Sequence, residues 1–413
     1  MLANKLRCSN RDVSPFQKTP ITIDNPNPYG TSANDQFGWS VAISGNKAII
    51  GANQEDDVNG NNAGKAYIVN STTGALLFTL NNPNTWGSTD NNYFAGSVDI
   101  SDNYAIVGSY GETDAGGSNS GRAYIYDTNT GSLLWTLNNP NAYGTSSGDY
   151  FGYRVGIKGN YAIVGAYREG DAGGTLSGKV YIYNVLTGAL IWTLNNPTAY
   201  GTSTNDYFGY SVAISGNYAI IGAYGEGDAG GTSSGKAYIY NVLTGALMWT
   251  LNNPTTYGTS ANDYFGNSVA ISGNYAIVGA WQEDDAGGNS SGKAYIFNVL
   301  TGAFVRTLNN PNAVGGSAND YFGFRVGITT NYAIVGAYGE SAGGTNTMAG
   351  EAYIFNINTG ALVKSIADPN KYSSAKNDYF GFSVDISGNR AIVGAYREGD
   401  AGGTLSGKAY IFA

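Results

Sequence analysis

One unit of about 57 residues recurs seven times along this chain of 413 residues. A phenylalanine marks each copy, and successive copies are 57 residues apart, with a final interval of 58: Phe37, Phe94, Phe151, Phe208, Phe265, Phe322 and Phe380. A unit this short cannot bury an apolar face alone, so the copies have to pack on one another. The repeat therefore predicts either a closed ring or an open stack of seven similar units.

The fourth copy shows what one unit contains. It divides into short β-branched and aromatic runs separated by Gly, Asn and Ser, which predicts strands near Ser211–Ser215, Tyr218–Ala223, Lys236–Asn241 and Ala246–Asn252. Short turns join the first strand to the second and the third to the fourth, and the other two connections are long. Four short antiparallel strands per repeat are typical of a β-propeller blade.

The two ends of the chain predict how the ring closes. The last copy ends at Ala413 after its third strand, while TPITIDNP near the N-terminus resembles the fourth-strand ending WTLNNP. An open stack would need atypical capping repeats, and none is visible. We predict an all-β, seven-bladed β-propeller of four-stranded antiparallel blades over residues 20–413, closed by its N-terminal strand. Residues 1–19 form an N-terminal arm that could serve as an attachment segment.

Composition excludes several function classes. The formal net charge is −9 and no Lys/Arg stripe is present, so nucleic acid is not an expected partner. The chain has no histidine and one cysteine, Cys8, which excludes a zinc site or a Cys–His dyad. No stretch reaches the roughly 18 apolar residues of a membrane span, and the first residues lack the apolar core of a secretory signal.

The repeat resembles the FG-GAP repeat family, which forms the seven-bladed propeller of integrin α chains and of many bacterial and viral surface proteins. The matching dipeptides are Phe-Gly at Phe151-Gly152, Phe208-Gly209, Phe265-Gly266, Phe322-Gly323 and Phe380-Gly381, and Gly-Ala at Gly165-Ala166, Gly222-Ala223, Gly279-Ala280, Gly336-Ala337 and Gly394-Ala395. Integrin-like members hold calcium in a D-x-D-x-D-G-type loop between the first two strands of a blade. That loop has shrunk to Ser-Gly-Asn here, so the resemblance implies a type without the usual calcium site and with no required cofactor.

The long connections predict where recognition takes place. In a four-stranded antiparallel blade, the loop between strands two and three and the link to the next blade emerge on one side of the disc, which we name the long-loop face. The opposite side, the tight-turn face, carries only short turns. Loops on a rigid scaffold often carry binding residues, so the long-loop face is the better candidate.

Acidic residues recur on the long-loop face and have two interpretations. The functional one is a set of calcium sites, each of which pairs an inter-blade Asp with an acidic residue of the neighbouring loop. The other is that these residues cap turns through Asx-type hydrogen bonds and keep the face soluble, which is favoured because their spacing matches no defined metal loop. The candidate calcium ligands are Glu169, Asp171, Glu226, Asp228, Glu283, Asp285, Glu398 and Asp400.

Aromatic residues also recur in the inter-blade links, next to Asn, Asp and Ser. Such rings could stack on the apolar faces of sugars while carboxylates accept hydrogen bonds from hydroxyls, or they could pack between blades instead. The candidate ligand-binding residues are Tyr29, Trp86, Tyr143, Tyr200, Tyr257, Tyr372, Asp149, Asp206, Asp263 and Asp320.

We expect a non-enzymatic binding protein, because only carboxylates remain as acid and base and they recur sevenfold, whereas an active site breaks symmetry. The expected setting is extracellular or on a virion or bacterial surface, with multivalent binding of a protein or glycan ligand. Residues 1–19 would contact other virion or surface proteins. Two alternatives are a filament or other homo-oligomer assembled by exchange of the N-terminal strand, and a carbohydrate-active enzyme.

Overall fold

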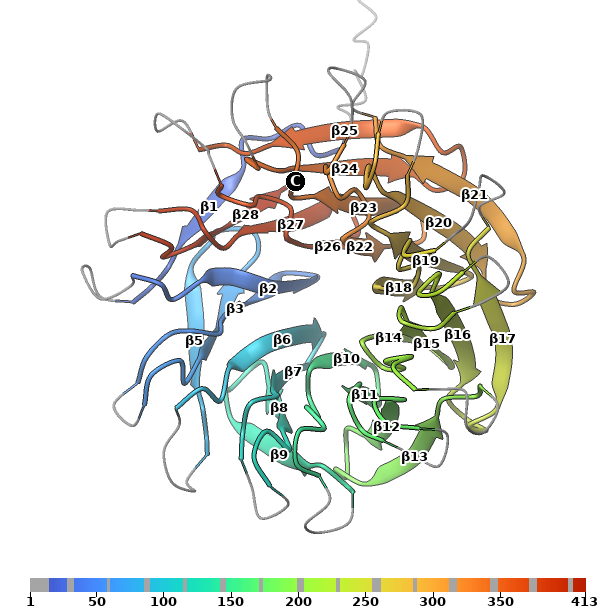
Figure 1. The fold of residues 1–413 in the computed structure, drawn as a ribbon. Helices are drawn as coiled ribbons and strands as arrows, with labels where there is room; N and C mark the ends of the chain where they lie inside the picture. The colour runs from blue at the N-terminus through green and yellow to red at the C-terminus, as the bar shows by residue number, and fades with distance from the viewer. Residues whose placement is uncertain are drawn as a thin grey trace, which may run out of the picture.

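Seven four-stranded antiparallel sheets form a ring in the computed structural model of the protein (Figure 1). Their first strands line a central channel that contains two cavities. Within the described residues every regular element is a strand. None of the described residues form a helix long and apolar enough to cross a membrane. The structure describes residues 15–27, 33–57, 60–84, 90–113, 117–141, 146–170, 174–198, 204–227, 231–254, 261–284, 288–311, 318–341, 348–370, 377–399 and 404–413.

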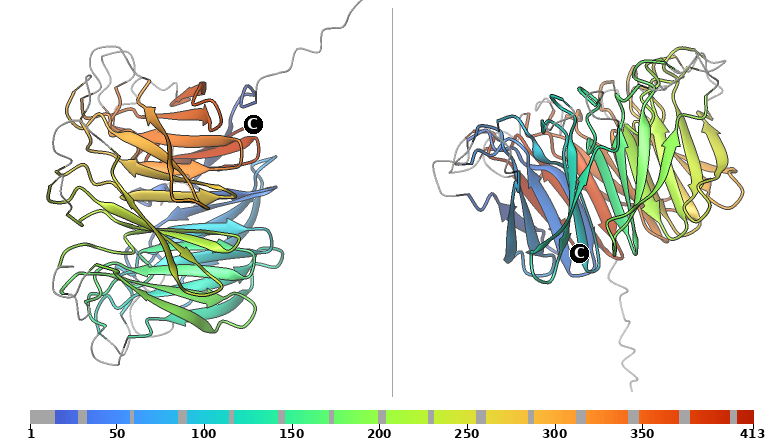
Figure 2. Two further views of the ribbon diagram at one scale, coloured as in Figure 1. Left: turned by 90° about the vertical axis from the view of Figure 1, so that its right-hand side faces the viewer. Right: turned by 90° about the horizontal axis from the view of Figure 1, so that it is seen from below.

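The strands of each blade run in order from the channel to the rim, and they cross the thickness of the disc (Figure 2). The first strands, in order of blades 1 to 7, are β2 (Phe37–Ser44), β6 (Phe94–Ser101), β10 (Arg154–Lys158), β14 (Ser211–Ser215), β18 (Ser268–Ser272), β22 (Arg325–Ile328) and β26 (Ser383–Ser387). The second strands are β3 (Lys47–Ala52), β7 (Tyr104–Ser109), β11 (Tyr161–Ala166), β15 (Tyr218–Ala223), β19 (Tyr275–Ala280), β23 (Tyr332–Ala337) and β27 (Arg390–Ala395).

The outer half of each blade follows the same order. The third strands are β4 (Lys65–Asn70), β8 (Arg122–Asp127), β12 (Lys179–Asn184), β16 (Lys236–Asn241), β20 (Lys293–Asn298), β24 (Glu351–Asn356) and β28 (Lys408–Phe412). The fourth strands are β5 (Leu76–Asn81), β9 (Leu133–Asn138), β13 (Leu190–Asn195), β17 (Leu247–Asn252), β21 (Phe304–Asn309), β25 (Leu362–Ala367) and, for blade 7, β1 (Ile21–Asp24). The strands predicted for the fourth copy are confirmed, with β17 beginning one residue later than expected.

Burial explains why the inner strands are apolar on both faces. In β15 every residue after Tyr218 is buried, because neighbouring blades cover both faces of the sheet. In the outer strand β17 only Leu251 is buried and the other residues are at least partly exposed, as expected of an edge. A Gly216–Asn217 turn suffices between β14 and β15, because Gly216 adopts a positive φ of 58°.

The Phe-Gly and Gly-Ala dipeptides hold adjacent blades together. Phe208 is fully buried between blades, with its ring 5.7 Å from that of Tyr238. Gly222, from the Gly-Ala of blade 4, faces the backbone of Gly266, from the Phe-Gly of blade 5. A methyl group on Gly222 would overlap the Gly266 carbonyl oxygen. Glycine is therefore required at Gly222 because two backbones meet there.

The N-terminal strand completes the ring, as predicted. Strand β1 pairs antiparallel with β28, with Ile21 opposite Ile411, and this pairing completes blade 7 (Figure 1). Most of the predicted arm, residues 1–14, lies outside the described residues. Its last part packs on the disc: Phe16 is fully buried, and the Lys18 backbone N–H donates to the Ala413 carbonyl oxygen at 3.2 Å. The attachment role of the arm stays a prediction.

Candidate functional site

A buried glutamate starts each connection between strands two and three. Glu169 is typical: it accepts hydrogen bonds from the Tyr181 hydroxyl at 2.9 and 2.7 Å and pairs with Lys179 Nζ at 2.6 Å. Burial raises the pKa of Glu169, against the lowering effect of Lys179 and Tyr181. The same buried position is occupied by Glu55, Glu112, Glu169, Glu226, Glu283, Glu340 and Glu398.

The cation beside this glutamate differs in two blades. Arg122 replaces lysine in blade 2, where it pairs with Glu112, and Glu351 stands at the equivalent position in blade 6. The partner hydroxyl is invariant and comes from Tyr67, Tyr124, Tyr181, Tyr238, Tyr295, Tyr353 and Tyr410. These glutamates therefore serve as internal acceptors that fix the start of the loop on the third strand.

The inter-blade aspartates are buried as well. Asp149 Oδ2 accepts hydrogen bonds from the side-chain amides of Asn139 at 3.0 Å and Asn141 at 2.9 Å. Asp206, Asp263 and Asp320 accept equivalent bonds from Asn196, Asn253 and Asn310. Burial raises the pKa of Asp149, and in Asp263 burial followed by the charge of Glu283 raises it to about 7. These four candidate ligand-binding residues thus lie beneath the long-loop face, bonded to the end of the preceding blade.

The other candidates lie partly outside the described residues. Of the calcium candidates, Glu169, Glu226, Glu283 and Glu398 are described, and Asp171, Asp228, Asp285 and Asp400 lie outside the described residues. The aromatic candidates Tyr29, Trp86, Tyr143, Tyr200, Tyr257 and Tyr372 also lie outside them. Sugar stacking by those six rings stays a prediction.

A different set of aromatic rings lines the inner part of the long-loop face. They lie before each repeat phenylalanine (Tyr93, Tyr150, Tyr207, Tyr264, Tyr321, Tyr379), two residues after it (Trp39, Tyr153, Tyr210, Phe324, Phe382) and after the Gly-Ala position (Tyr110, Tyr167, Tyr224, Trp281, Tyr338, Tyr396). We name this set the aromatic belt. All of these rings except Phe382 and Tyr396 are partly exposed.

The aromatic belt is continuous from blade 2 round to blade 1, with one gap between blades 1 and 2. Ring follows ring from Tyr93 in blade 2, round the channel, to Trp39 in blade 1, with centroids 4.9 to 6.0 Å apart. Between blades 1 and 2 the belt positions are taken by Gln36, Asn53 and Gly96. The sequence carried a signal for the belt, since an aromatic residue recurs beside nearly every Phe-Gly and Gly-Ala.

The belt surrounds the channel that the first strands enclose. An upper cavity of about 120 Å³, next to the belt, is lined by Trp39 and by the serines of several first strands. A lower cavity of about 440 Å³ lies toward the tight-turn face and contains Asp99, Asp385 and Lys158. The long-loop face therefore offers an aromatic rim around a polar opening.

Comparison with known families decides how this architecture is classified. The FG-GAP repeat model matches seven segments: residues 28–69, 88–126, 141–183, 197–240, 255–297, 312–355 and 373–412. The chain belongs to the FG-GAP repeat family. A comparison with curated proteins found no significant match.

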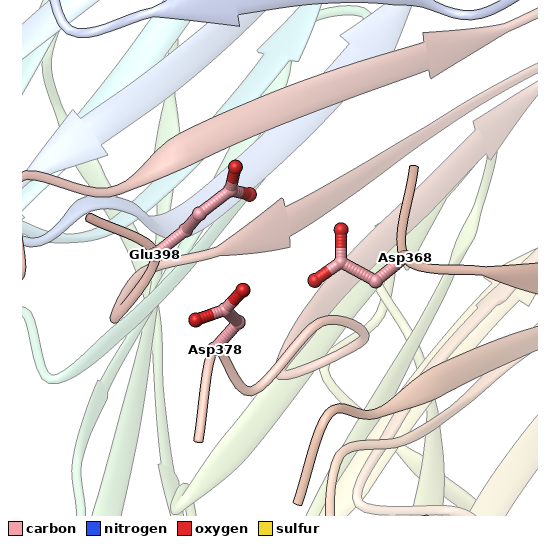
Figure 3. A group of neighbouring side chains, drawn as sticks. All are labelled: Asp368, Asp378 and Glu398. Atoms are coloured by element: carbon pink, nitrogen blue, oxygen red, sulfur yellow. The ribbon is translucent and has the colours of Figure 1, made fainter. Parts of the chain in front are cut away.

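One carboxylate cluster departs from the sequence repeat of this FG-GAP propeller. Asp368, at the end of blade 6, replaces the asparagine found at this position in the other blades, and its carboxyl group converges with those of Asp378 and Glu398 (Figure 3). One oxygen from each lies within 4.8 Å of the others, the only such acidic or metal-ligating group among the described residues. Burial, followed by the charge of Glu398, raises the pKa of Asp368 to about 8.

This acidic group lies away from the turn between the first and second strands, where the resemblance to integrin-like members would place calcium. Three carboxylates supply the hard oxygen ligands that calcium prefers, although calcium usually takes six to eight such ligands. The structure thus brings the calcium candidate Glu398 together with the inter-blade Asp378, as the calcium interpretation expects, and adds a third acid, Asp368, that the sequence did not single out. Calcium binding there stays a prediction.

Proposed function

We propose that this protein is a non-enzymatic binding protein of a virion or bacterial surface, and that it recognises a surface glycan through its long-loop face. The observation that carries the proposal is the aromatic belt, which presents partly exposed rings from all seven blades around one opening. Aromatic rings stack on the apolar faces of sugars, and tyrosine adds a hydroxyl that bonds to sugar hydroxyls. Because similar aromatic rings recur in each blade, several weak contacts with one ligand can combine into a higher overall affinity, since each bound contact raises the effective concentration for the next.

The internal hydrogen bonds and ion pairs of the repeated acidic residues support binding over catalysis. The repeated glutamates, such as Glu169, are buried acceptors for a tyrosine and, in most blades, a cation. A general acid or base has to reach the atoms of its substrate, and these carboxylates are turned inward. FG-GAP propellers are also typically non-catalytic.

The family supports an outer-surface location. FG-GAP repeats are typical of extracellular and surface proteins. Attachment is assigned in this proposal to residues 1–19, which carry Lys5, Arg7, Arg11 and Lys18 against one acidic residue, Asp12. Phe16 would anchor this segment to the disc at the point where the ring closes.

A glycan array with product analysis tests the proposal. The intact, fluorescently labelled chain is applied to immobilised neutral and acidic glycans, and the same glycans are incubated with it in solution and analysed by mass spectrometry. We expect retention on a subset of glycans, with all glycan masses unchanged. Release of shortened sugars would contradict a non-enzymatic function, and no retention on any glycan would contradict a glycan ligand.

A further inference from the structure

The channel-facing residues of the first strands vary between blades in a paired pattern. In blade order, the third residue after the repeat phenylalanine is Ser40, Ser97, Arg154, Ser211, Ser268, Arg325 and Ser383. The fifth is Ala42, Asp99, Gly156, Ala213, Ala270, Gly327 and Asp385. Blades 2 and 7 thus share Ser and Asp, blades 3 and 6 share Arg and Gly, and the other three share Ser and Ala. The pattern is symmetric about blade 1, so the charged residues occur as matched pairs around the channel.

The two acidic members of this pattern are engaged with the backbone of adjacent blades. Asp99 Oδ2 accepts a hydrogen bond from the Ile157 N–H at 2.7 Å, and Asp385 Oδ2 accepts one from the Ile43 N–H at 2.8 Å. Both aspartates line the lower cavity. They satisfy N–H groups that an innermost strand would otherwise leave unpaired.

The two arginines line the upper cavity, beside the aromatic belt. Arg154 Nη1 donates to the Tyr153 carbonyl oxygen at 3.1 Å, and its guanidinium lies 4.8 Å from the Tyr153 ring centroid. Arg325 repeats this arrangement with Phe324, at 2.9 Å and 4.5 Å. Each side chain is thus held against the belt residue that precedes it, which fixes both guanidinium groups at the channel opening.

No described carboxylate lies within ion-pair distance of Arg154 or Arg325. The two cations also act on each other: burial, followed by the positive charge of Arg154, lowers the pKa of Arg325 to about 9. Two like charges in one small cavity repel each other unless an anion binds between them. Guanidinium groups match the geometry of carboxylate, sulfate and phosphate, to which they donate paired hydrogen bonds.

We propose that the upper cavity is an oxyanion-binding site, in which Arg154 and Arg325 hold one carboxylate, sulfate or phosphate group at the centre of the long-loop face. The volume of about 120 Å³ admits a group of a few atoms, so the remainder of a larger ligand would lie on the aromatic belt. This inference rests on the proposed function and narrows it: the surface glycan recognised there carries an acidic sugar.

The experiment uses simple anions and variants that the chain itself supplies. Inorganic phosphate, sulfate, galacturonate and neutral galactose are titrated into the intact protein by calorimetry at constant ionic strength. Intrinsic tryptophan fluorescence, to which Trp39 beside the upper cavity contributes, is recorded as a second readout. Arg154→Ser/Arg325→Ser restores the serine of the other five blades, and Arg154→Gln/Arg325→Gln keeps more of the side chain. Lys158→Ser is the matched control, because it removes a channel cation at the opposite end and installs the residue found in most blades.

We expect the wild type and Lys158→Ser to bind the oxyanions equally and to leave galactose unbound, while both arginine double variants bind them at least tenfold more weakly. Tighter binding of galacturonate than of phosphate would identify an acidic sugar as the source of the group, and equal binding would identify a free oxyanion. The site is refuted if the wild type binds no oxyanion at millimolar concentration, or if a folded double variant binds as well as the wild type. If glycan-array binding persists unchanged in a double variant that has lost oxyanion binding, the narrowing to acidic glycans is wrong and the proposed function stands.

Discussion

Phe16 meets Tyr332 edge to face, with ring centroids 5.4 Å apart and ring planes at 88°. Phe16 thereby enters the core between blades 6 and 7. In blades 3 to 6, the matching core position is filled by the apolar residue that follows the third strand: Val185, Val242, Val299 and Ile357. In blade 7 the third strand is β28 (Lys408–Phe412), and Phe16 takes this core position. The N-terminal segment therefore supplies blade 7 with a core side chain, Phe16, as well as with its fourth strand, β1.

Removal of this side chain should weaken ring closure. Phe16→Ala is expected to lower the free energy of unfolding by about 3–5 kcal/mol, the usual cost of truncating a buried phenylalanine. Equilibrium urea unfolding measures the change, with Val185→Ala in blade 3 as the control for loss of the equivalent contact within a continuous blade. A change below about 0.5 kcal/mol for Phe16→Ala, the size of an ordinary surface effect, would show that Phe16 does not stabilise the closed ring.

Asp368 should make stability depend on pH. Its folded pKa, about 8, lies above the unfolded value of about 4, so the folded state binds the proton more tightly. The contribution of Asp368 to the free energy of unfolding is therefore most favourable at about pH 4 and below, and it declines as the pH rises toward 8. We expect Asp368→Asn to be more stable than the wild type by about 1–3 kcal/mol at pH 8 and similar to it near pH 4.

Thermal unfolding between pH 4 and 9, with a chelator present, measures this difference. Asn196→Asp is the matched control, because it places an acid beside Asp206 and Glu226 as Asp368 lies beside Asp378 and Glu398. That variant should lose stability above neutral pH. Parallel pH profiles for the wild type and Asp368→Asn would refute the raised pKa of Asp368 as the source of the pH dependence.

The buried pair of Glu169 and Lys179 should act as a unit. Lys179→Met leaves the Glu169 carboxylate without its cation and is expected to cost about 1–3 kcal/mol in unfolding free energy. Addition of Glu169→Gln removes the buried charge and should recover at least half of that loss, as a double-mutant cycle by urea unfolding would detect. Additive losses in the double variant would show that the two side chains are not coupled.

The sequence predicted the fold closely for a physical reason. Seven copies in register fix the number of blades, and the missing fourth strand after Phe412 matches the extra strand Ile21–Asp24. Turn chemistry at Gly216–Asn217 set the register of the inner hairpin, since glycine adopts the positive φ of 58° found there without strain. Phe16 was missed because its contact with Tyr332 bridges a separation in sequence that no local pattern reports.

The candidate site was less predictable, because burial cannot be read from spacing. Glu169 and Asp149 occupy loop positions that suggest solvent exposure. Tyr181 on β12 and Asn139 just after β9 nevertheless donate hydrogen bonds to them and make them internal acceptors. Arg154 stood out only once the structure placed it across the channel from Arg325. The sequence likewise shows Asp368 in place of the asparagine of the other blades, but only the structure shows that its carboxyl group lies near that of Glu398.

The most direct test of the account is to block each face of the disc in turn. In a Cys8→Ser background, a bulky polymer is coupled to a single cysteine at Thr204, which is exposed on the long-loop face, or at Asn217, which is exposed on the tight-turn face. Binding to a glycan retained on the array is then measured by surface plasmon resonance, before and after coupling. The account predicts that polymer at Thr204→Cys abolishes binding while polymer at Asn217→Cys leaves it intact. Full binding with the long-loop face blocked would contradict it.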